Sequence, residues 1–172
     1  MLKRADSGGS SVFDLIDGLP VHPLVVHAVV VLLPLACLGT IAIVVRPVWR
    51  ATYGLLVAAC TAVATVLIPV ATSSGEALEQ HVGDPGAHAE LGEQLIWFAL
   101  PLLVFVVALV WLARRSRPAA PAAWVPTTSD SQRRAIRIVA VLALVAAVAT
   151  SVQVYRVGDS GARAAWGDQV SD

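Results

Sequence analysis

Charged residues are scarce in this chain. Of its 172 residues only 14% are Asp, Glu, Lys or Arg, whereas 57% are hydrophobic. Soluble domains carry about 25% charged residues. Four stretches contain no charge at all, namely 23–45, 51–75, 94–113 and 138–155. Each is close to the roughly 20 residues that cross a bilayer as a helix. So short a chain could not bury four such helices in a water-soluble core, and the sequence predicts an all-α integral membrane four-helix bundle.

Cysteine is also rare. Cys37 and Cys60 fall in the first and second predicted helices, each about a dozen residues from the turn between them. A disulfide is compatible with their similar depths, but we favour two unpaired, small apolar side chains. Their spacing matches no cysteine metal motif. The sequence thus excludes a disulfide-rich or cysteine-zinc protein class.

Motifs of common enzyme classes are missing too. There is no phosphate-binding loop, and no basic patch interleaved with aromatic residues that would indicate nucleic acid as a partner. Ser160 lies in "GDSG", which is similar to a serine-protease signature, but the motif stands in a short tail with no plausible triad. We treat this match as accidental. The pattern favours a binding or structural protein over an enzyme.

The arginines indicate an orientation in the cell membrane. Eight of the twelve Lys and Arg (two and six) lie in the loops after the first and third predicted helices, with a single acid, Asp130. Short loops rich in Lys and Arg stay in the cytoplasm. We therefore expect a multi-pass protein whose termini and middle loop face outward. Anionic lipid is the expected partner of these arginines.

Three segments are expected along the chain. Residues 1–20 form an outer tail in which "SVFDLIDGL" is either an interfacial helix or a frayed segment. Residues 21–157 hold the four transmembrane helices, and residues 158–172 form an outer C-terminal tail. Ser73 and Glu76 fit a capping box, which predicts a short outer helix between the second and third transmembrane helices.

All four histidines fall on the predicted outer side. His22 and His27 begin the first helix, while His81 and His88 lie around the middle loop. At 1.5 Å per helical residue, His22 is about 36 Å from Arg46, and His88 is about 39 Å from Arg114. We therefore expect His22 and His88 to lie at one level. On the same measure His27 and Glu93 lie one layer deeper, at about 28 Å and 32 Å.

Three interpretations of this cluster remain open. In the first, a metal ion or haem iron in a redox role is bound by imidazoles, because histidine nitrogens suit zinc, copper and iron. In the second, His27 and Glu93 relay protons or orient a small ligand, because an ionisable residue within the membrane indicates a functional site by default. In the third, the histidines bond helix ends, and the protein is a non-catalytic structural or accessory subunit of a larger membrane complex. The candidate metal ligands are His22, His88, His27 and His81, and the candidate proton or ligand partners are Glu93 and Glu76.

Several motifs together carry a family resemblance. They are "GLPVHPLVVH", "SSGEALEQHV" followed by "HAELGEQ", and "YRVGDSGARAAW". With them the chain resembles the domain-of-unknown-function 2231 family of bacterial membrane proteins over roughly Leu19 to Trp166. The resemblance implies a four-helix integral membrane protein. Related domains occur joined to Rieske iron–sulfur modules, which suggests a redox partner, but the resemblance implies no catalytic residue.

Overall fold

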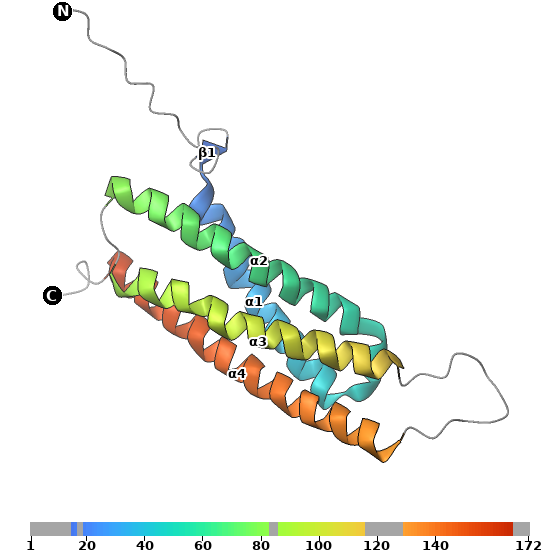
Figure 1. Ribbon diagram of the computed structural model, residues 1–172. Coiled ribbons are helices and arrows are strands. Elements are labelled where there is room, and N and C mark those ends of the chain that lie inside the picture. Colours follow the sequence, from blue (N-terminus) through green and yellow to red (C-terminus); the bar gives the residue numbers. More distant parts are fainter. Residues whose placement is uncertain (1–14, 17–18, 83–85, 116–128, 167–172) are drawn as a thin grey trace, which may run out of the picture.

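Four long helices make up the computed structural model of the protein (Figure 1). It describes residues 15–16, 19–82, 86–115 and 129–166, and within these ranges it leaves out the side chains of 15–16, 19–21, 77–82 and 164–165. The helices are α1 (Val21–Val45), α2 (Arg50–Val82), α3 (Ala87–Arg115) and α4 (Asp130–Trp166). The 3-10 helix η1 (Pro47–Trp49) joins α1 to α2.

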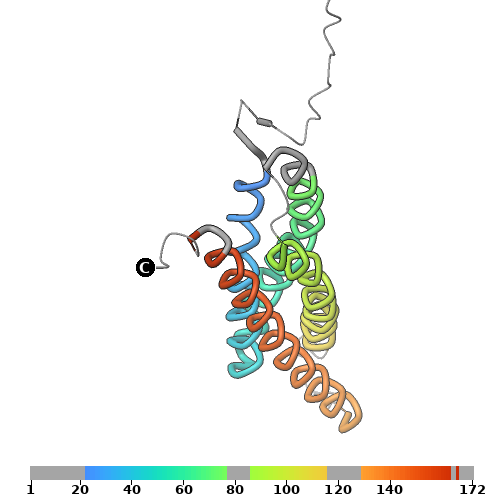
Figure 2. The backbone as a smooth tube through the Cα atoms, turned by 90° about the vertical axis from the view of Figure 1, so that its left-hand side faces the viewer, coloured from blue at the N-terminus to red at the C-terminus, as the bar shows by residue number. Residues whose placement is uncertain are grey.

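The helices form a closed bundle in which each helix packs on its neighbours in the chain and α1 packs on α4. Helices α1 and α3 therefore lie diagonally across the bundle. Figure 2 shows the same arrangement from the side, with the start of α1 and the end of α4 at one end of the molecule. Any group that reaches from α1 to α3 has to cross the centre of the bundle.

All four helices are long and apolar enough to span a membrane. They also leave large apolar side chains exposed along their length, as a lipid-facing surface requires; examples are Leu38, Leu56, Val104 and Val141. The predicted four-helix membrane fold is thus confirmed. Both cysteines are free, as we expected.

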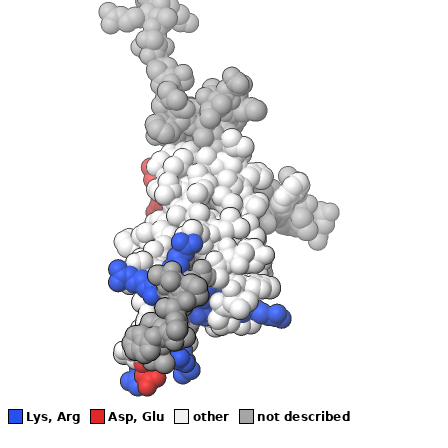
Figure 3. Space-filling view, turned by 90° about the vertical axis from the view of Figure 1, so that its right-hand side faces the viewer, with Lys and Arg blue, Asp and Glu red and all other residues white. Residues whose placement is uncertain are grey.

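Arginines gather at one end of this apolar body (Figure 3). Helix α1 ends and α2 begins there, next to Arg46 and Arg50, and α3 ends with Arg114 and Arg115. The first turns of α4 bring Arg133 and Arg134 to the same end. The opposite end, where α1 and α3 begin, carries His22 and His88.

A threonine hydroxyl links α4 to α3 inside the bundle. Pro101 interrupts α3 and cannot donate a backbone hydrogen bond to the preceding turn. The hydroxyl of Thr150 on α4 lies 3.1 Å from the carbonyl oxygen of Phe98, three residues before this proline. The carbonyl that Pro101 leaves without its helical donor is that of Trp97, four residues before the proline. The Thr150 hydroxyl also lies 2.8 Å from Ala146 O of its own helix, so its contact with Phe98 O is an additional link between α4 and α3 near Pro101.

The two helical hairpins repeat one another. The buried positions 29, 33, 36, 40 and 43 of α1 match the buried positions 95, 99, 102, 106 and 109 of α3, each 66 residues later (95 − 29 = 66). The buried positions 57, 61 and 64 of α2 match 143, 147 and 150 of α4, each 86 residues later (143 − 57 = 86). Both hairpins run in the same direction through the bundle. This pattern indicates a parallel internal repeat of the two hairpins.

Three local predictions differ from the structure. Helix α2 runs without a break to Val82, so the predicted short outer helix beginning at Ser73 is part of α2; the Ser73 hydroxyl donates to Pro69 O within the helix instead of capping one. Helix α4 continues to Trp166 instead of ending at residue 157. In the N-terminal segment, β1 (Leu15–Ile16) and β2 (Leu19–Pro20) pair antiparallel where an interfacial helix was one alternative, and its other residues lie outside the described part of the chain.

Candidate functional site: two anchored histidines across one pocket

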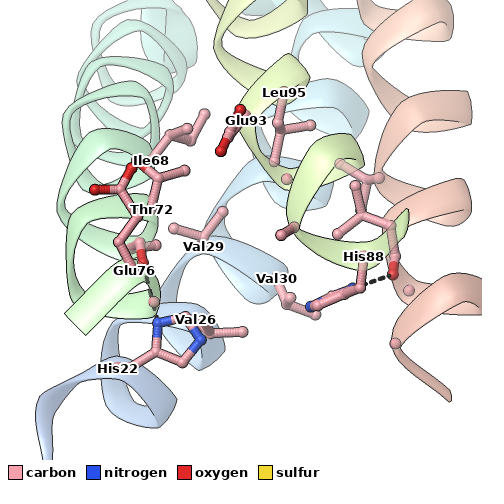
Figure 4. A pocket seen from close by; sticks show the side chains of 18 residues that line it. His22, Val26, Val29, Val30, Ile68, Thr72, Glu76, His88, Glu93 and Leu95 are labelled. Carbon is pink, nitrogen blue, oxygen red and sulfur yellow. Dashed lines mark hydrogen bonds between the residues drawn. The ribbon is translucent and has the colours of Figure 1, made fainter. Parts of the chain in front are cut away.

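A pocket of about 370 Å³ lies at the end of the bundle opposite the arginines (Figure 4). Its polar side chains include His22, Glu76, His88 and Glu93, and all four helices contribute to its walls. Val29, Ile68 and Leu95 are buried beneath it in one apolar cluster. Pockets for small molecules and cofactors have volumes of this order and similar apolar walls with a few polar groups.

His22 reaches the pocket from the first turn of α1 and is fixed by α2. Its Nδ1 lies 3.0 Å from the carbonyl oxygen of Ala71 and 3.1 Å from Oγ of Ser74. The Ser74 hydroxyl donates to the same Ala71 carbonyl at 3.0 Å. The ring passes close to Gly75, where an added Cβ would be 3.0 Å from Cε1. The glycine therefore gives the ring the room to approach α2.

His88 is held in the same way by the second hairpin. Its Nδ1 lies 3.2 Å from the carbonyl oxygen of Val157 and 3.3 Å from Oγ of Ser160. The Ser160 hydroxyl donates to Val157 O at 2.9 Å. A Cβ on Gly161 would lie 2.9 Å from Cε1 of the imidazole. The two sites thus have the same arrangement. In each hairpin a histidine on the first helix contacts a carbonyl, a serine and a glycine on the second helix.

The internal repeat explains this likeness. His22 and His88 are related by the 66-residue offset of the first helices (88 − 22 = 66). Ser74 and Ser160 are related by the 86-residue offset of the second helices (160 − 74 = 86), and so are their neighbouring glycines. The two histidines therefore occupy equivalent places on diagonally opposed helices, and both line the one pocket.

The carbonyl contacts determine which ring nitrogen carries the proton. A carbonyl oxygen only accepts hydrogen bonds, so Nδ1 of each imidazole must be the donor. In the neutral ring Nε2 then carries the lone pair. Among the described residues, neither Nε2 has a hydrogen-bond partner. Each histidine thus presents a fixed, basic nitrogen that is available to a ligand.

The same contacts exclude a serine nucleophile. A hydroxyl is activated when the imidazole nitrogen facing it can accept its proton. At His22 and at His88 the nitrogen that faces the serine is Nδ1, which a carbonyl already holds in the protonated state. Ser74 and Ser160 therefore position the rings. The similarity of "GDSG" to a protease signature is accidental on these grounds as well.

Two further glycines leave space on one side of the pocket. A Cβ added to Gly92 of α3 or to Gly158 of α4 would meet no atom within 4 Å. The equivalent places in the first hairpin are filled by Val26 and Thr72 (92 − 66 = 26; 158 − 86 = 72), which also line the pocket. Beside Gly92 and Gly158 the backbone of α3 and α4 therefore borders open space in the pocket.

Glu76 and Glu93 bring carboxyl groups to the wall formed by α2 and α3 (Figure 4). Both residues are exposed. Glu93 stands 66 residues after His27 (93 − 27 = 66), so the repeat places a carboxylate in one hairpin where the other has an imidazole. The acids make the two halves of the pocket chemically different.

Of the other two predicted ligands, His27 does not join this pair. His27 is exposed, does not line the pocket, and bonds through Nδ1 to the Pro23 carbonyl of its own helix. Five residues rotate a helix by about 140°, which turns His27 away from His22. The side chain of His81 lies outside the described residues. Among the described residues, no three His, Cys, Asp or Glu side chains form a group that could hold a metal ion.

Comparison with known proteins identifies the family. Residues 18–172 match the family described as a predicted membrane protein (DUF2231). The chain belongs to this family. No curated protein matches the chain, and no solved structure matches it. The match covers both hairpins of the DUF2231 chain, including the two anchored histidines and the serine–glycine pairs that hold them.

Proposed function

We propose that the protein binds one haem between His22 and His88 and acts as a one-electron carrier in the membrane. The observation that carries the proposal is the paired anchoring of the two imidazoles. A metal-ligating histidine almost always donates its other ring N–H to a carbonyl or carboxylate, which fixes the ring and raises its basicity. Both Nδ1 atoms here face a backbone carbonyl.

The number of ligands favours haem over a bare metal ion. A structural zinc ion needs four protein ligands, and a catalytic zinc ion needs three. The described residues offer two anchored imidazoles and no group of three candidate ligands. Haem iron needs one or two axial ligands from the protein, because the macrocycle supplies the others. Two histidines on diagonal helices are the donor set that a haem would use.

The walls of the pocket also suit a flat apolar group. Val29, Ile68 and Leu95 form an apolar floor, and Gly92 and Gly158 leave open space beside the backbone. Cofactor sites in helix bundles are built in this way, from side chains on facing helices. Haem also explains why glycines occupy positions on transmembrane helices where larger residues would otherwise fill space.

The proposed role is electron transfer with a redox partner. His22 and His88 would hold the haem, and the haem would supply a one-electron couple between a reduced and an oxidised partner. The arginine-rich loops support an orientation with the histidine end on the outer face of the cell membrane. The partner would then meet the protein at that face or within a larger membrane complex.

The test is a haem titration of purified apoprotein in detergent. We expect one equivalent of haem to bind and to give a reduced-minus-oxidised spectrum with sharp α and Soret bands. His22→Ala should abolish or greatly weaken binding. The matched control is His27→Ala on the same helix, which removes an imidazole outside the pocket and should leave the titration unchanged.

Haem binding that is equal in wild type and His22→Ala would contradict the proposal. So would the absence of binding in a well-folded wild-type protein. Stable co-purification of that colourless protein with a membrane complex would instead favour the structural or accessory subunit.

A further inference from the structure

A second cavity lies outside the bundle centre, in the groove between α1 and α2. Its volume is about 680 Å³, and its walls are almost wholly apolar. Leu32, Leu35 and Gly39 of α1 face Leu56, Ala59 and Val63 of α2 across it. No residue of the histidine pocket lines this groove, so the two cavities are separate.

The groove has the length of one lipid chain. On α1 it runs from Leu32 to Ile43, a rise of about 16 Å at 1.5 Å per residue. The hydrocarbon core of a bilayer is about 30 Å thick, so one leaflet contributes about 15 Å. The groove therefore spans the depth of one leaflet, starting from the arginine end of the bundle.

Aromatic residues close that end of the groove. The rings of Trp49 and Tyr53 meet edge to face with centroids 6.1 Å apart, and both line the cavity. The guanidinium of Arg46 lies 5.6 Å from the centroid of the Trp49 ring. Trp and Tyr at this depth are typical of the interface between chains and headgroups. A molecule in the groove would thus place its polar end beside Arg46.

Arg46 and Arg50, the two arginines that flank η1, make different contacts. Arg50 donates from Nε to Ile43 O at 2.8 Å and from an Nη to Val44 O at 3.3 Å, so it is occupied in closing the end of α1. Arg46 is exposed, and among the described residues no carboxylate pairs with it. The charge that remains available beside the groove is therefore positive.

We propose that this groove is a specific site for one anionic phospholipid. An acyl chain lies between α1 and α2, and the phosphate pairs with the guanidinium of Arg46. Charge complementarity selects this occupant over a neutral lipid, since each basic residue near a membrane surface attracts anionic lipid. The proposal does not depend on haem, because the groove and the histidine pocket share no residue.

The test is native mass spectrometry of the purified full chain, titrated with phosphatidylglycerol and, separately, with phosphatidylcholine. We expect the wild type to bind its first phosphatidylglycerol roughly fivefold more tightly than phosphatidylcholine, the preference that one basic residue supplies. Arg46→Gln should remove this preference, because it removes the positive charge that distinguishes the anionic lipid from the zwitterionic one.

Arg115→Gln is the matched control. Arg115 also stacks on a tryptophan, 3.7 Å from the centroid of the Trp111 ring, at the same end of the bundle but away from the groove. The Arg115→Gln variant should keep the preference for phosphatidylglycerol over phosphatidylcholine. A second variant, Ala59→Phe, fills the groove from an exposed position and should weaken binding of both lipids.

Two results would overturn the proposal. One is the same phosphatidylglycerol preference in wild type and Arg46→Gln. The other is a lipid-free dimer that Ala59→Phe converts to a monomer, because the groove would then be covered by a second copy of the chain.

Discussion

Gly161 of α4 lies directly against His88 of α3, so close that a Cβ on the glycine would stand 2.9 Å from Cε1 of the imidazole. Gly75 has the same relation to His22 in the other hairpin, at 3.0 Å. Each imidazole occupies space that a side chain at the glycine position would otherwise fill. The two glycines therefore help to set the positions of the imidazoles, together with the carbonyls that hold Nδ1.

Adding a methyl group at these glycines should be costly. We predict that Gly75→Ala and Gly161→Ala destabilise the apoprotein by about 1–3 kcal/mol, because each histidine must leave its place or its rotamer. Gly92→Ala and Gly158→Ala are matched controls, since their added Cβ meets nothing within 4 Å. Removing glycine from a helix interior should stabilise them by up to about 1 kcal/mol. Thermal unfolding in detergent measures all four, and equal effects at the four glycines would contradict the account.

The serine hydroxyls should matter for cofactor affinity. Substitution of groups that orient a metal-ligating histidine typically costs about 10–100-fold in affinity. We expect Ser74→Ala and Ser160→Ala to weaken haem binding by roughly tenfold each, at the low end because the carbonyl contacts remain. Similar losses at the two sites would reflect the internal repeat. Ser73→Ala is the control, since among the described residues this hydroxyl bonds Pro69 O of its own helix and neither histidine. A loss of affinity in Ser73→Ala equal to that in Ser74→Ala would contradict a specific role for Ser74.

The carboxylates should tune the redox potential. Glu76 and Glu93 line the pocket, and their negative charge favours the ferric over the ferrous state of a haem bound there. We predict that Glu76→Gln and Glu93→Gln raise the midpoint potential by on the order of 30–60 mV, where 59 mV is a tenfold shift of a one-electron equilibrium. Glu90→Gln on the exposed side of α3 should not change it. Spectroelectrochemical titration of the holoprotein measures the midpoint potential of each variant. A lower midpoint potential in Glu76→Gln or Glu93→Gln would contradict this prediction.

Much of the fold follows from the sequence, because charge-free stretches of about 20 residues have few alternatives to a membrane helix. That His22 and His88 line one pocket at the same end of the bundle fits the prediction, which used helical rise from Arg46 and Arg114 to estimate depth. The direction in which each side chain points around its helix axis was harder to predict. Depth alone placed His27 beside Glu93, but His27 is exposed outside the pocket whereas Glu93 lines it.

The serine–glycine anchors were missed, although the sequence holds a signal for them. Ser74–Gly75 and Ser160–Gly161 form the same dipeptide in the parts of α2 and α4 that lie at the histidine end of the bundle. Local patterns pointed elsewhere: one dipeptide lies inside an apparent capping box, and the other inside an apparent tail. In both places the helix continues, and its serine donates to a carbonyl in the preceding turn. A search for repeats between the two halves of the chain would have paired them.

The central claim is that both imidazoles ligate one iron, and electron paramagnetic resonance of the ferric protein tests it most directly. We predict one low-spin signal in the wild type and in His27→Ala. His22→Ala and His88→Ala should each lose it, with any remaining haem in the high-spin state, and added imidazole should restore the low-spin signal. A low-spin signal that survives unchanged in either single variant would contradict the account.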